Sequence, residues 1–255
     1  MKVIILAGGY GTRLSEYTNT IPKPMVPIGD RPILWHIMKI YEYYGFSDFV
    51  LALGYKSQDI KEYFLKYHAL NSDFTVDLTS GEVKHHEIDR VRWKVMLKNT
   101  GLDTMTGGRI KRLKEVINGE RFLLTYGDGV ANVNIKGLIE FHESHGKLIT
   151  VTAVRPTARF GYLDFEGDRV SRFEEKSQLN EGWINGGFFV CEPELLDYIH
   201  NDNQMLEREP LERIVEENQL MAFKHSGFWQ SMDTLRDQKI LENLWNTGKA
   251  PWRIW

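Results

Sequence analysis

The apolar run from Val3 to Ala7 leads directly into a loop with glycines at positions 8, 9 and 11. Such a run predicts a buried strand, and glycines let the backbone come close to a bulky anion. Arg13 and Lys23 supply the positive charge that a polyphosphate requires. Since α/β sheets bind ligands at the carboxyl ends of their strands, this segment predicts a phosphate-binding loop, with a plain tight turn as the alternative.

Two common phosphate motifs do not fit this loop. The dinucleotide fingerprint Gly-x-Gly-x-x-Gly, counted from Gly9, requires a glycine where the chain has Leu14. A Walker A loop requires Gly-Lys-Ser/Thr, whereas Gly11 is followed by Thr12 and Arg13. The sequence therefore supports neither a dehydrogenase nor a P-loop ATPase.

Bulk properties exclude several classes of protein. A net charge of −3 and a pI near 6.3 argue against a nucleic-acid binder held by general electrostatics. No apolar run approaches the length of a membrane span, and the chain opens on a strand without signal-peptide features. The single cysteine, Cys191, cannot form an internal disulfide. We expect a cytoplasmic protein without nucleic-acid or membrane partners.

Strand patterns alternate with helical patterns through much of the chain. The expected strands are Val3–Ala7, Phe49–Leu53, Phe122–Tyr126 and Leu148–Val154, and the expected helices are Ile33–Tyr44, Asp59–Tyr67 and Ile135–His145. This order predicts an α/β fold with a mostly parallel, Rossmann-like sheet that is covered by helices on both faces.

We expect one domain over residues 1–255 with a small β excursion at 74–99 and a C-terminal helix and aromatic tail at 228–255. In the excursion, Thr75–Leu78, Val83–Ile88 and Trp93–Leu97 predict antiparallel strands or a flap over the sheet. Later segments predict three more strands and a last helix, namely Tyr162–Phe165, Val170–Phe173, Phe188–Cys191 and Asp233–Trp245.

Two aspartates are candidate metal ligands. Asp128 stands between two glycines at the end of an expected strand, where it can bind a hard cation or simply belong to a turn. Asp233 precedes the last helical pattern, where it can be a ligand or an N-cap. Magnesium on phosphates takes one or two carboxylates, so this pair would suffice.

Other signals are weaker. Lys176 ends an expected strand and could meet a second phosphate, and Asn185-Gly-Gly187 could contact sugar hydroxyls or form a bulge. Residues 105–112 open a helix with glycines and positive charge, which favours an anion or a base edge, or forms a solvated basic face.

The segments Leu6–Leu14, Lys23–Met25, Gly127–Gly129, Glu175–Lys176 and Asn185–Gly187 resemble the signature of the sugar-phosphate nucleotidylyltransferases. The stretches 32–38, 105–109, 228–237 and 248–252 resemble the glucose-1-phosphate cytidylyltransferase branch, and the resemblance spans essentially the whole chain. It implies that an oxygen of glucose 1-phosphate attacks the α-phosphorus of CTP, giving CDP-glucose and pyrophosphate. It also implies a homo-oligomer and a place in lipopolysaccharide O-antigen synthesis.

The resemblance assigns roles to residues of this chain. Arg13, Lys23 and Lys176 are implied as catalytic residues that stabilise phosphate charge, and Asp128 and Asp233 as ligands of Mg²⁺. The implied substrate contacts are Leu6, Ala7, Gly8, Gly9, Gly11, Thr12, Arg13, Lys23, Thr104, Arg109, Asp128, Glu175, Lys176, Asn185 and Gly186.

Two alternatives stay open. One is the same reaction with UTP or dTTP, although those relatives usually carry proline where this chain has Ser15. The other is a non-catalytic sugar-nucleotide sensor of the same fold. A sensor need not keep both carboxylates and all three cations, and this chain has them all.

Overall fold

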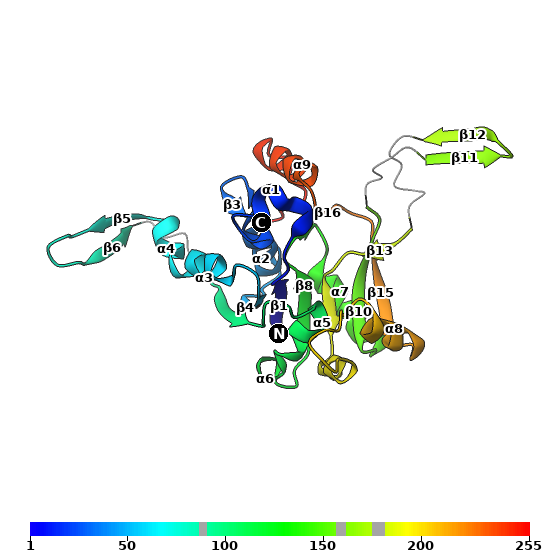
Figure 1. Cartoon of the computed structure of the whole chain (residues 1–255), viewed down its shortest axis with the longest axis horizontal. Coiled ribbons are helices and arrows are strands. Elements are labelled where there is room, and N and C mark those ends of the chain that lie inside the picture. Colours follow the sequence, from blue (N-terminus) through cyan, green and yellow to red (C-terminus); the bar gives the residue numbers. More distant parts are fainter. Residues whose placement is uncertain (87–90, 157–161, 175–181) are drawn as a thin grey trace.

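The computed structural model describes residues 1–86, 91–156, 162–174 and 182–255 and is built on one central sheet (Figure 1). The sheet consists of β1 (Lys2–Ala7), β4 (Asp48–Leu53), β7 (Lys94–Asn99), β8 (Phe122–Tyr126), β10 (Ile149–Val154), β13 (Ile184–Asn185), β14 (Phe189–Cys191) and β15 (Leu220–His225). β1 lies between β4 and β8 and is parallel to both, and β7 continues the parallel set beyond β4.

On the other side of β8, strand β14 runs antiparallel, and β10 is antiparallel to β14 and parallel to β15. β13 pairs with the same strand β10, further along it. β13 and β14 run in the same direction along β10, and between them Gly187 and Phe188 have φ of 76° and 48°. β1, β4, β7, β8, β10 and β15 thus share one direction, and their carboxyl ends lie at one edge of the sheet.

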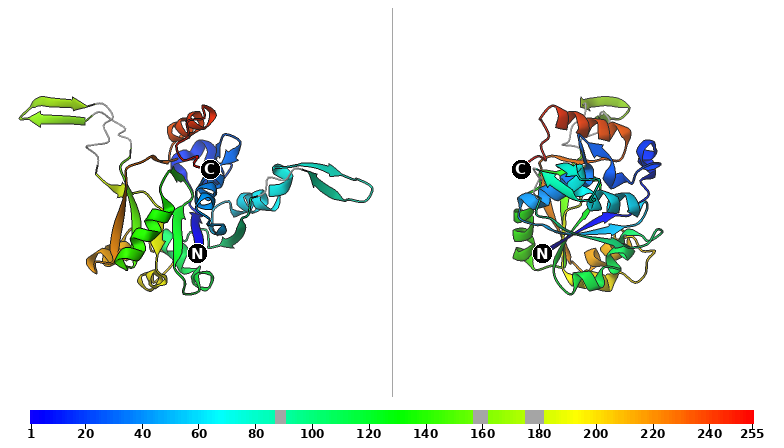
Figure 2. Two further views of the ribbon diagram at one scale, coloured as in Figure 1. Left: turned by 180° about the vertical axis from the view of Figure 1, so that it is seen from behind. Right: turned by 90° about the vertical axis from the view of Figure 1, so that its left-hand side faces the viewer.

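Both faces of the sheet are buried, as the alternation along β1 shows. Val3, Ile5 and Ala7 pack into one apolar cluster with α2 (Ile33–Tyr43), α7 (Ile135–His145) and α9 (Leu235–Asn246). Ile4 and Leu6 pack into a second cluster on the opposite face with α5 (Thr106–Lys111), α6 (Lys114–Ile117) and α8 (Glu209–Glu216). Each fully buried aliphatic side chain contributes about 1.5–3 kcal/mol. The expected α/β class, a mostly parallel sheet covered on both faces, is confirmed (Figure 2).

Short elements complete the described chain. The remaining helices are α1 (Ser15–Thr18), α3 (Ser57–Leu65), α4 (Tyr67–Leu70) and the 3-10 turns η1 (Thr12–Leu14), η2 (Lys23–Met25) and η4 (Pro193–Tyr198). The remaining strands form four antiparallel pairs, β2 (Pro27–Ile28) with β3 (Arg31–Pro32), β5 (Asp73–Val76) with β6 (Val83–His86), β9 (Gly129–Ala131) with β16 (Trp229–Ser231), and β11 (Tyr162–Glu166) with β12 (Arg169–Glu174). No helix in the described ranges is both long and apolar enough to cross a membrane.

The region around residues 74–99 needs one correction. β5 and β6 do form an antiparallel hairpin, but the segment predicted at Trp93–Leu97 belongs to β7, a parallel strand of the main sheet. Its alternation has another cause. β7 is an edge strand, with Val95 and Leu97 against the core and Met96 45% exposed. Half-buried edge strands alternate whether they are parallel or not.

An aromatic cluster fixes the C-terminal segment against α2. Trp252 is fully buried, and its Nε1 donates a hydrogen bond to Nδ1 of His36 at 3.3 Å. The other ring nitrogen, Nε2, lies 2.9 Å from the carbonyl oxygen of Ile28, so the ring is neutral and donates there. Trp245 packs edge-on against the same imidazole, with ring centroids 4.5 Å apart. His36 is therefore held in one tautomer by its neighbours.

We predict that His36 makes the fold sensitive to acid. Burial lowers the pKa of His36 to about 4, and the Ile28 carbonyl only partly opposes this shift. Because the unfolded chain binds more protons between pH 6.5 and 4, the free energy of unfolding falls as the pH drops through that window. The total loss is on the order of 3 kcal/mol. Urea unfolding at several pH values gives the free energy of unfolding as a function of pH. Between pH 6.5 and 4 this free energy should fall less steeply for His36→Gln than for the wild type. Equal slopes would contradict the prediction.

Candidate functional site

The glycine loop after β1 has a backbone shape that only glycine adopts readily. Gly11 has φ of 65°, and a Cβ there would lie 2.8 Å from Cγ2 of Thr18. The carbonyl of Gly11 accepts from the backbone N–H of Leu14 at 3.0 Å, which begins the turn η1. This turn places Arg13 beside the carboxyl end of the sheet, with its side chain 73% exposed.

Arg109 on α5 holds the walls of the loop together. Its Nη2 donates to the carbonyl of Gly8 at 2.9 Å, and its Nη1 donates to the carbonyls of Leu53 at 3.1 Å and Gly101 at 2.7 Å. The guanidinium also packs against two glycines, since a Cβ on Gly8 or on Gly54 would lie 2.4–2.5 Å from it. Burial, followed by the nearby Arg112, lowers the pKa of Arg109. This arginine is therefore engaged with backbone carbonyls of the protein.

Two distant aspartates are brought together by the short ladder between β9 and β16. Its register places Ser231 opposite Gly129, so the residues just beyond these two come next to each other. The backbone N–H of Met232 donates to the carbonyl of Asp128 at 2.8 Å. Asp233 follows Met232 and thereby reaches the turn at the end of β8.

Lys23 bridges the two carboxylates. Its Nζ lies 2.7 Å from Oδ2 of Asp128 and 2.7 Å from Oδ1 of Asp233, and Arg13 Nη2 lies 2.9 Å from the same Oδ1. Burial would lower the pKa of Lys23, but the carboxylates outweigh it and raise that pKa. Burial would likewise raise the pKa of Asp233, but the hydrogen bond and charge of Lys23, with Arg13, hold it below its usual range. Both groups are therefore charged near neutral pH.

The structure shows that Asp233 is not the N-cap of α9. The N-cap of α9 is Thr234, whose hydroxyl accepts from the backbone N–H of Asp237 at 3.3 Å, and the Asp237 carboxylate accepts in return from the Thr234 N–H at 2.9 Å. This is a capping box. Asp233 is thus free of the cap and faces Lys23, Arg13 and the hydroxyl of Ser231.

A cavity of about 470 Å³ opens between the glycine loop and the start of α5, and its size is typical of small-molecule sites. Eleven of the predicted site residues line it, namely Leu6, Ala7, Gly8, Gly9, Gly11, Thr12, Arg13, Lys23, Thr104, Arg109 and Asp128. Asp233 joins them through its bonds to Lys23 and Arg13.

Of the residues predicted for the sugar side, Asn185 and Gly186 are not part of this lining. Asn185 donates from Nδ2 to the hydroxyl of Tyr126 at 3.2 Å, so it reaches the cavity through a lining residue. The carbonyl of Gly186 accepts from Nε1 of Trp229 at 2.8 Å. Glu175 and Lys176 lie outside the described residues.

Several lining residues were not predicted from the sequence. Tyr10 donates to Oδ1 of Asp103 at 2.7 Å, and this bond joins the glycine loop to the loop before α5, both of which line the cavity. Tyr126 and Thr106 also line the cavity. Tyr126 directly precedes the Gly-Asp-Gly turn, and that position was the available signal. Nothing local in the sequence indicates the pairing of Tyr10 with Asp103.

Within the described chain, no three histidine, cysteine, aspartate or glutamate side chains form a metal-binding group. Asp128 and Asp233 make a two-carboxylate pair, to which the side chains of Lys23 and Arg13 are bound as cations. Such a pair is suited to a hard divalent ion that takes its other oxygens from a phosphate and from water. The glycine loop and the paired charges together could hold a polyphosphate next to a divalent cation.

Comparisons with known proteins agree with this geometry. The family model described as "Nucleotidyl transferase" matches residues 2–237. Glucose-1-phosphate cytidylyltransferase of Salmonella typhi is 51% identical, and a probable glucose-1-phosphate cytidylyltransferase of Bacillus subtilis is 46% identical, each over 100% of both chains. The structure of HddC from Yersinia pseudotuberculosis, complexed with GMP-PN, is 25% identical with a TM-score of 0.70, covering 96% of this chain and 99% of that one. This chain belongs to the nucleotidyl transferase family, and it is a nucleotidyltransferase enzyme.

Proposed function

We propose that this enzyme transfers the cytidylyl group of CTP to α-D-glucose 1-phosphate, giving CDP-glucose and pyrophosphate. The full-length similarity to the Salmonella typhi cytidylyltransferase supports this choice of substrates. The observation that carries the reaction type is the convergence of Asp128, Asp233, Lys23 and Arg13 beside the glycine loop. That set holds both the carboxylates for a divalent ion and the cations for phosphate oxygens.

The reaction is an in-line displacement at phosphorus. A phosphate oxygen of glucose 1-phosphate forms a bond to the α-phosphorus of CTP, and the bond from that phosphorus to the bridging oxygen of pyrophosphate breaks. No protein nucleophile takes part. Arg13 and Lys23 would neutralise the charge on the phosphates, and the backbone of the glycine loop would approach the triphosphate closely. The protein therefore contributes position and charge.

We propose Mg²⁺ as the divalent ion, held by Asp128 and Asp233. The fit rests on these two carboxylate oxygens, which converge on a single cationic atom, Nζ of Lys23, at 2.7 Å each. When bound, the ion would polarise the α-phosphate as a Lewis acid. Asp128 and Asp233 would orient it, and Ser231 would fix the second carboxylate through its hydroxyl.

On the sugar side, Asn185 and Gly186 remain our proposed contacts for glucose 1-phosphate, with Glu175 and Lys176. On the nucleotide side, Thr104 lines the cavity and its backbone or hydroxyl could meet the base. Arg109 would act differently from a free arginine, because its guanidinium already donates to carbonyls of the surrounding loops. Its contribution would be to the shape of the nucleotide pocket.

The decisive assay measures pyrophosphate release from glucose 1-phosphate and Mg²⁺ with CTP, UTP, dTTP, GTP and ATP tested separately. We expect CTP to be used at least about tenfold better than any other triphosphate, a difference of about 1.4 kcal/mol at the transition state. Pyrophosphate release with UTP or dTTP instead of CTP would show that the enzyme uses a different nucleotide from the one proposed. No release with any triphosphate would favour a sugar-nucleotide sensor.

The same assay tests the catalytic role of Arg13 with the variant Arg13→Gln. Loss of the guanidinium should lower kcat by about 100-fold, as for other groups that stabilise transition-state charge. Because its side chain is 73% exposed, the melting temperature should change by no more than about 2 °C. A large drop in melting temperature would indicate a structural role instead.

A second prediction concerns Lys23 and the order of binding. Its ammonium lies between the two carboxylates, so Asp128 and Asp233 would hold a divalent ion only once Lys23 has moved toward a phosphate. Titration of Mn²⁺ into the nucleotide-free enzyme should show weak binding, at least about tenfold weaker than to Lys23→Gln. Lys39→Gln, which removes a lysine paired with Glu42 on α2, is the matched control and should behave as wild type. Equal affinities in all three proteins would contradict the prediction.

We further propose a homo-oligomer. The β5–β6 hairpin projects from the body of the protein with Phe74, Val76, Leu78 and Val83 exposed by 41–91% (Figures 1 and 2). An isolated two-stranded hairpin is only marginally stable in water, so its apolar side chains would gain from a second copy of the chain. Light scattering should therefore give a multiple of 29.7 kDa, and a monomer mass would contradict the proposal.

We also propose a cytoplasmic location. Cys191 is the only cysteine and is buried, so the chain makes no use of an oxidising compartment. Fractionation of cells into soluble, periplasmic and membrane material would test this.

A further inference from the structure

A chain of hydrogen bonds crosses from the nucleotide side of the cavity to Asn185, and Glu207 lies at its centre. Oε2 of Glu207 accepts from the hydroxyl of Thr106 at 2.6 Å, and Oε1 accepts from the hydroxyl of Tyr126 at 2.6 Å. The Tyr126 oxygen accepts in turn from Nδ2 of Asn185 at 3.2 Å. One carboxylate therefore connects α5, the end of β8 and β13.

The chemistry of the groups fixes the direction of every bond. A carboxylate has no proton to give, so both hydroxyls donate to Glu207. The lone pairs of the Tyr126 oxygen are then available to Asn185, which presents its NH₂ group. On its other side, Oδ1 of Asn185 accepts from the backbone N–H of Gly187 at 2.9 Å. The amide is thus held at both ends in one orientation.

Tyr126 is kept as a proton donor by its surroundings. Burial, followed by the charge of Glu207 and the hydrogen bond to it, raises the pKa of Tyr126. In the described chain Glu207 forms no ion pair with a lysine, arginine or histidine, so the two hydroxyls are its partners. Hydrogen bonds to a charged group are about twice as strong as neutral ones.

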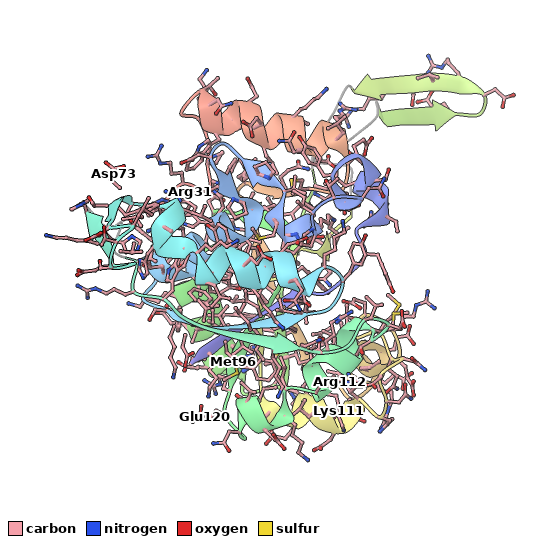
Figure 3. All side chains as sticks on the ribbon, turned by 60° about the vertical axis from the view of Figure 1, so that its left-hand side comes forward. Arg31, Asp73, Met96, Lys111, Arg112 and Glu120 are labelled. Carbon is pink, nitrogen blue, oxygen red and sulfur yellow. The ribbon has the colours of Figure 1, made fainter. Side chains whose placement is uncertain are left out.

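The segment that carries Glu207 is docked firmly on α5. The backbone N–H of Met105 donates to the carbonyl of Asp202 at 2.8 Å, and Leu206 donates its N–H to the hydroxyl of Thr106 at 2.9 Å. A Cβ on Gly107 or Gly108 would lie 2.7 or 2.5 Å from backbone oxygens of this segment, so the two glycines allow the close approach. Figure 3 shows Lys111 and Arg112 at the end of the same helix.

We propose that Glu207 is a positioning residue for the sugar-phosphate side of the site. Through Tyr126 it orients the amide of Asn185 toward the hydroxyls of a hexose phosphate, and through Thr106 it ties that orientation to the nucleotide-side helix α5. The identity of the ligand at Asn185 rests on the function proposed above. Since Tyr126 also precedes Gly127 and Asp128, the same carboxylate steadies the strand end that carries the first aspartate.

The kinetic test compares Glu207→Gln, Tyr126→Phe and the double variant. Glutamine keeps the size of Glu207 but offers one acceptor oxygen for two donors, and phenylalanine removes the link to Asn185. The KM for glucose 1-phosphate should rise at least about fivefold in each single variant, while the KM for CTP stays within about twofold. If Glu207 acts through Tyr126, the double variant should be no worse than Tyr126→Phe alone.

Tyr198→Phe is the matched control. The hydroxyl of Tyr198 donates a hydrogen bond to Glu217 at the surface, away from the cavity lining. The substitution therefore removes the same kind of tyrosine–glutamate hydrogen bond. Both KM values should stay at the wild-type level. Additive effects of Glu207→Gln and Tyr126→Phe, or equal increases in both KM values, would overturn the proposal. So would a loss of melting temperature without a change in KM.

A stability measurement keeps the inference testable if no triphosphate supports turnover, an outcome that would defeat the proposed function alone. The urea midpoint of unfolding is measured for Tyr126→Phe, for Asn185→Ala and for the double variant that carries both. The same three variants are then measured in a protein that also carries Glu207→Gln. We expect the two substitutions to be non-additive in the wild type and additive once Glu207 is replaced. The same coupling in both backgrounds would show that Glu207 does not orient the Tyr126–Asn185 pair, and would overturn the inference.

Discussion

The site depends on one buried ammonium group. Lys23 joins Asp128 and Asp233, which lie 105 and 210 positions further along the chain. A buried charge without a counterion is costly, so the lysine and the two aspartates require one another in the ligand-free protein. Their meeting point needs the turn at η2, the end of β8 and the β9–β16 ladder all in place. The interaction between Lys23 and the two aspartates therefore forms only when the carboxyl edge of the sheet is correctly assembled.

A second buried cation, Arg109, shapes the cavity in a different way. It has backbone carbonyls as partners where Lys23 has carboxylates, and those carbonyls lie at or just beyond the carboxyl ends of β1, β4 and β7. This explains a sequence feature far from α5. Gly8 and Gly54 leave the space that the guanidinium fills, because a side chain at either position would collide with it. The glycine at position 8 thus serves the protein's own packing as well as any approach of a phosphate.

Much of the fold could be predicted because it is encoded locally. Patterns of about a dozen residues or fewer predict the apolar strand β1, the helix Ile135–His145 and the glycine loop. The prediction of an antiparallel strand or flap at β7 is wrong. Alternation of apolar and polar residues indicates burial of one face and does not show the direction of the neighbouring strand. β15 was missed, although it pairs with β10 along six residues, since its burial is only partial and its pattern weak.

The candidate site shows the same division. The Gly-Asp-Gly turn was enough to single out Asp128 from the sequence. Which residue caps α9 needed the structure, because Asp233 and Thr234 are equally good caps by sequence. Glu207 has no local signal at all. It matters only because two glycines let its segment close on α5, and such tertiary contacts leave no periodic pattern in a single sequence.

The charges of the site suit substrates that would bring their own cation, as the proposed function requires. Arg13 and Lys23 carry two positive charges, and Asp128 and Asp233 carry two negative ones, so these four side chains sum to zero. A triphosphate and a sugar phosphate would add several negative charges that this set leaves unbalanced. Under the proposed function, a divalent ion that binds with the triphosphate would offset part of this charge and would be held by the two carboxylates, and Lys23 would then meet the phosphates. The same four side chains would thus serve the ligand-free site and the proposed reactive complex in two different pairings.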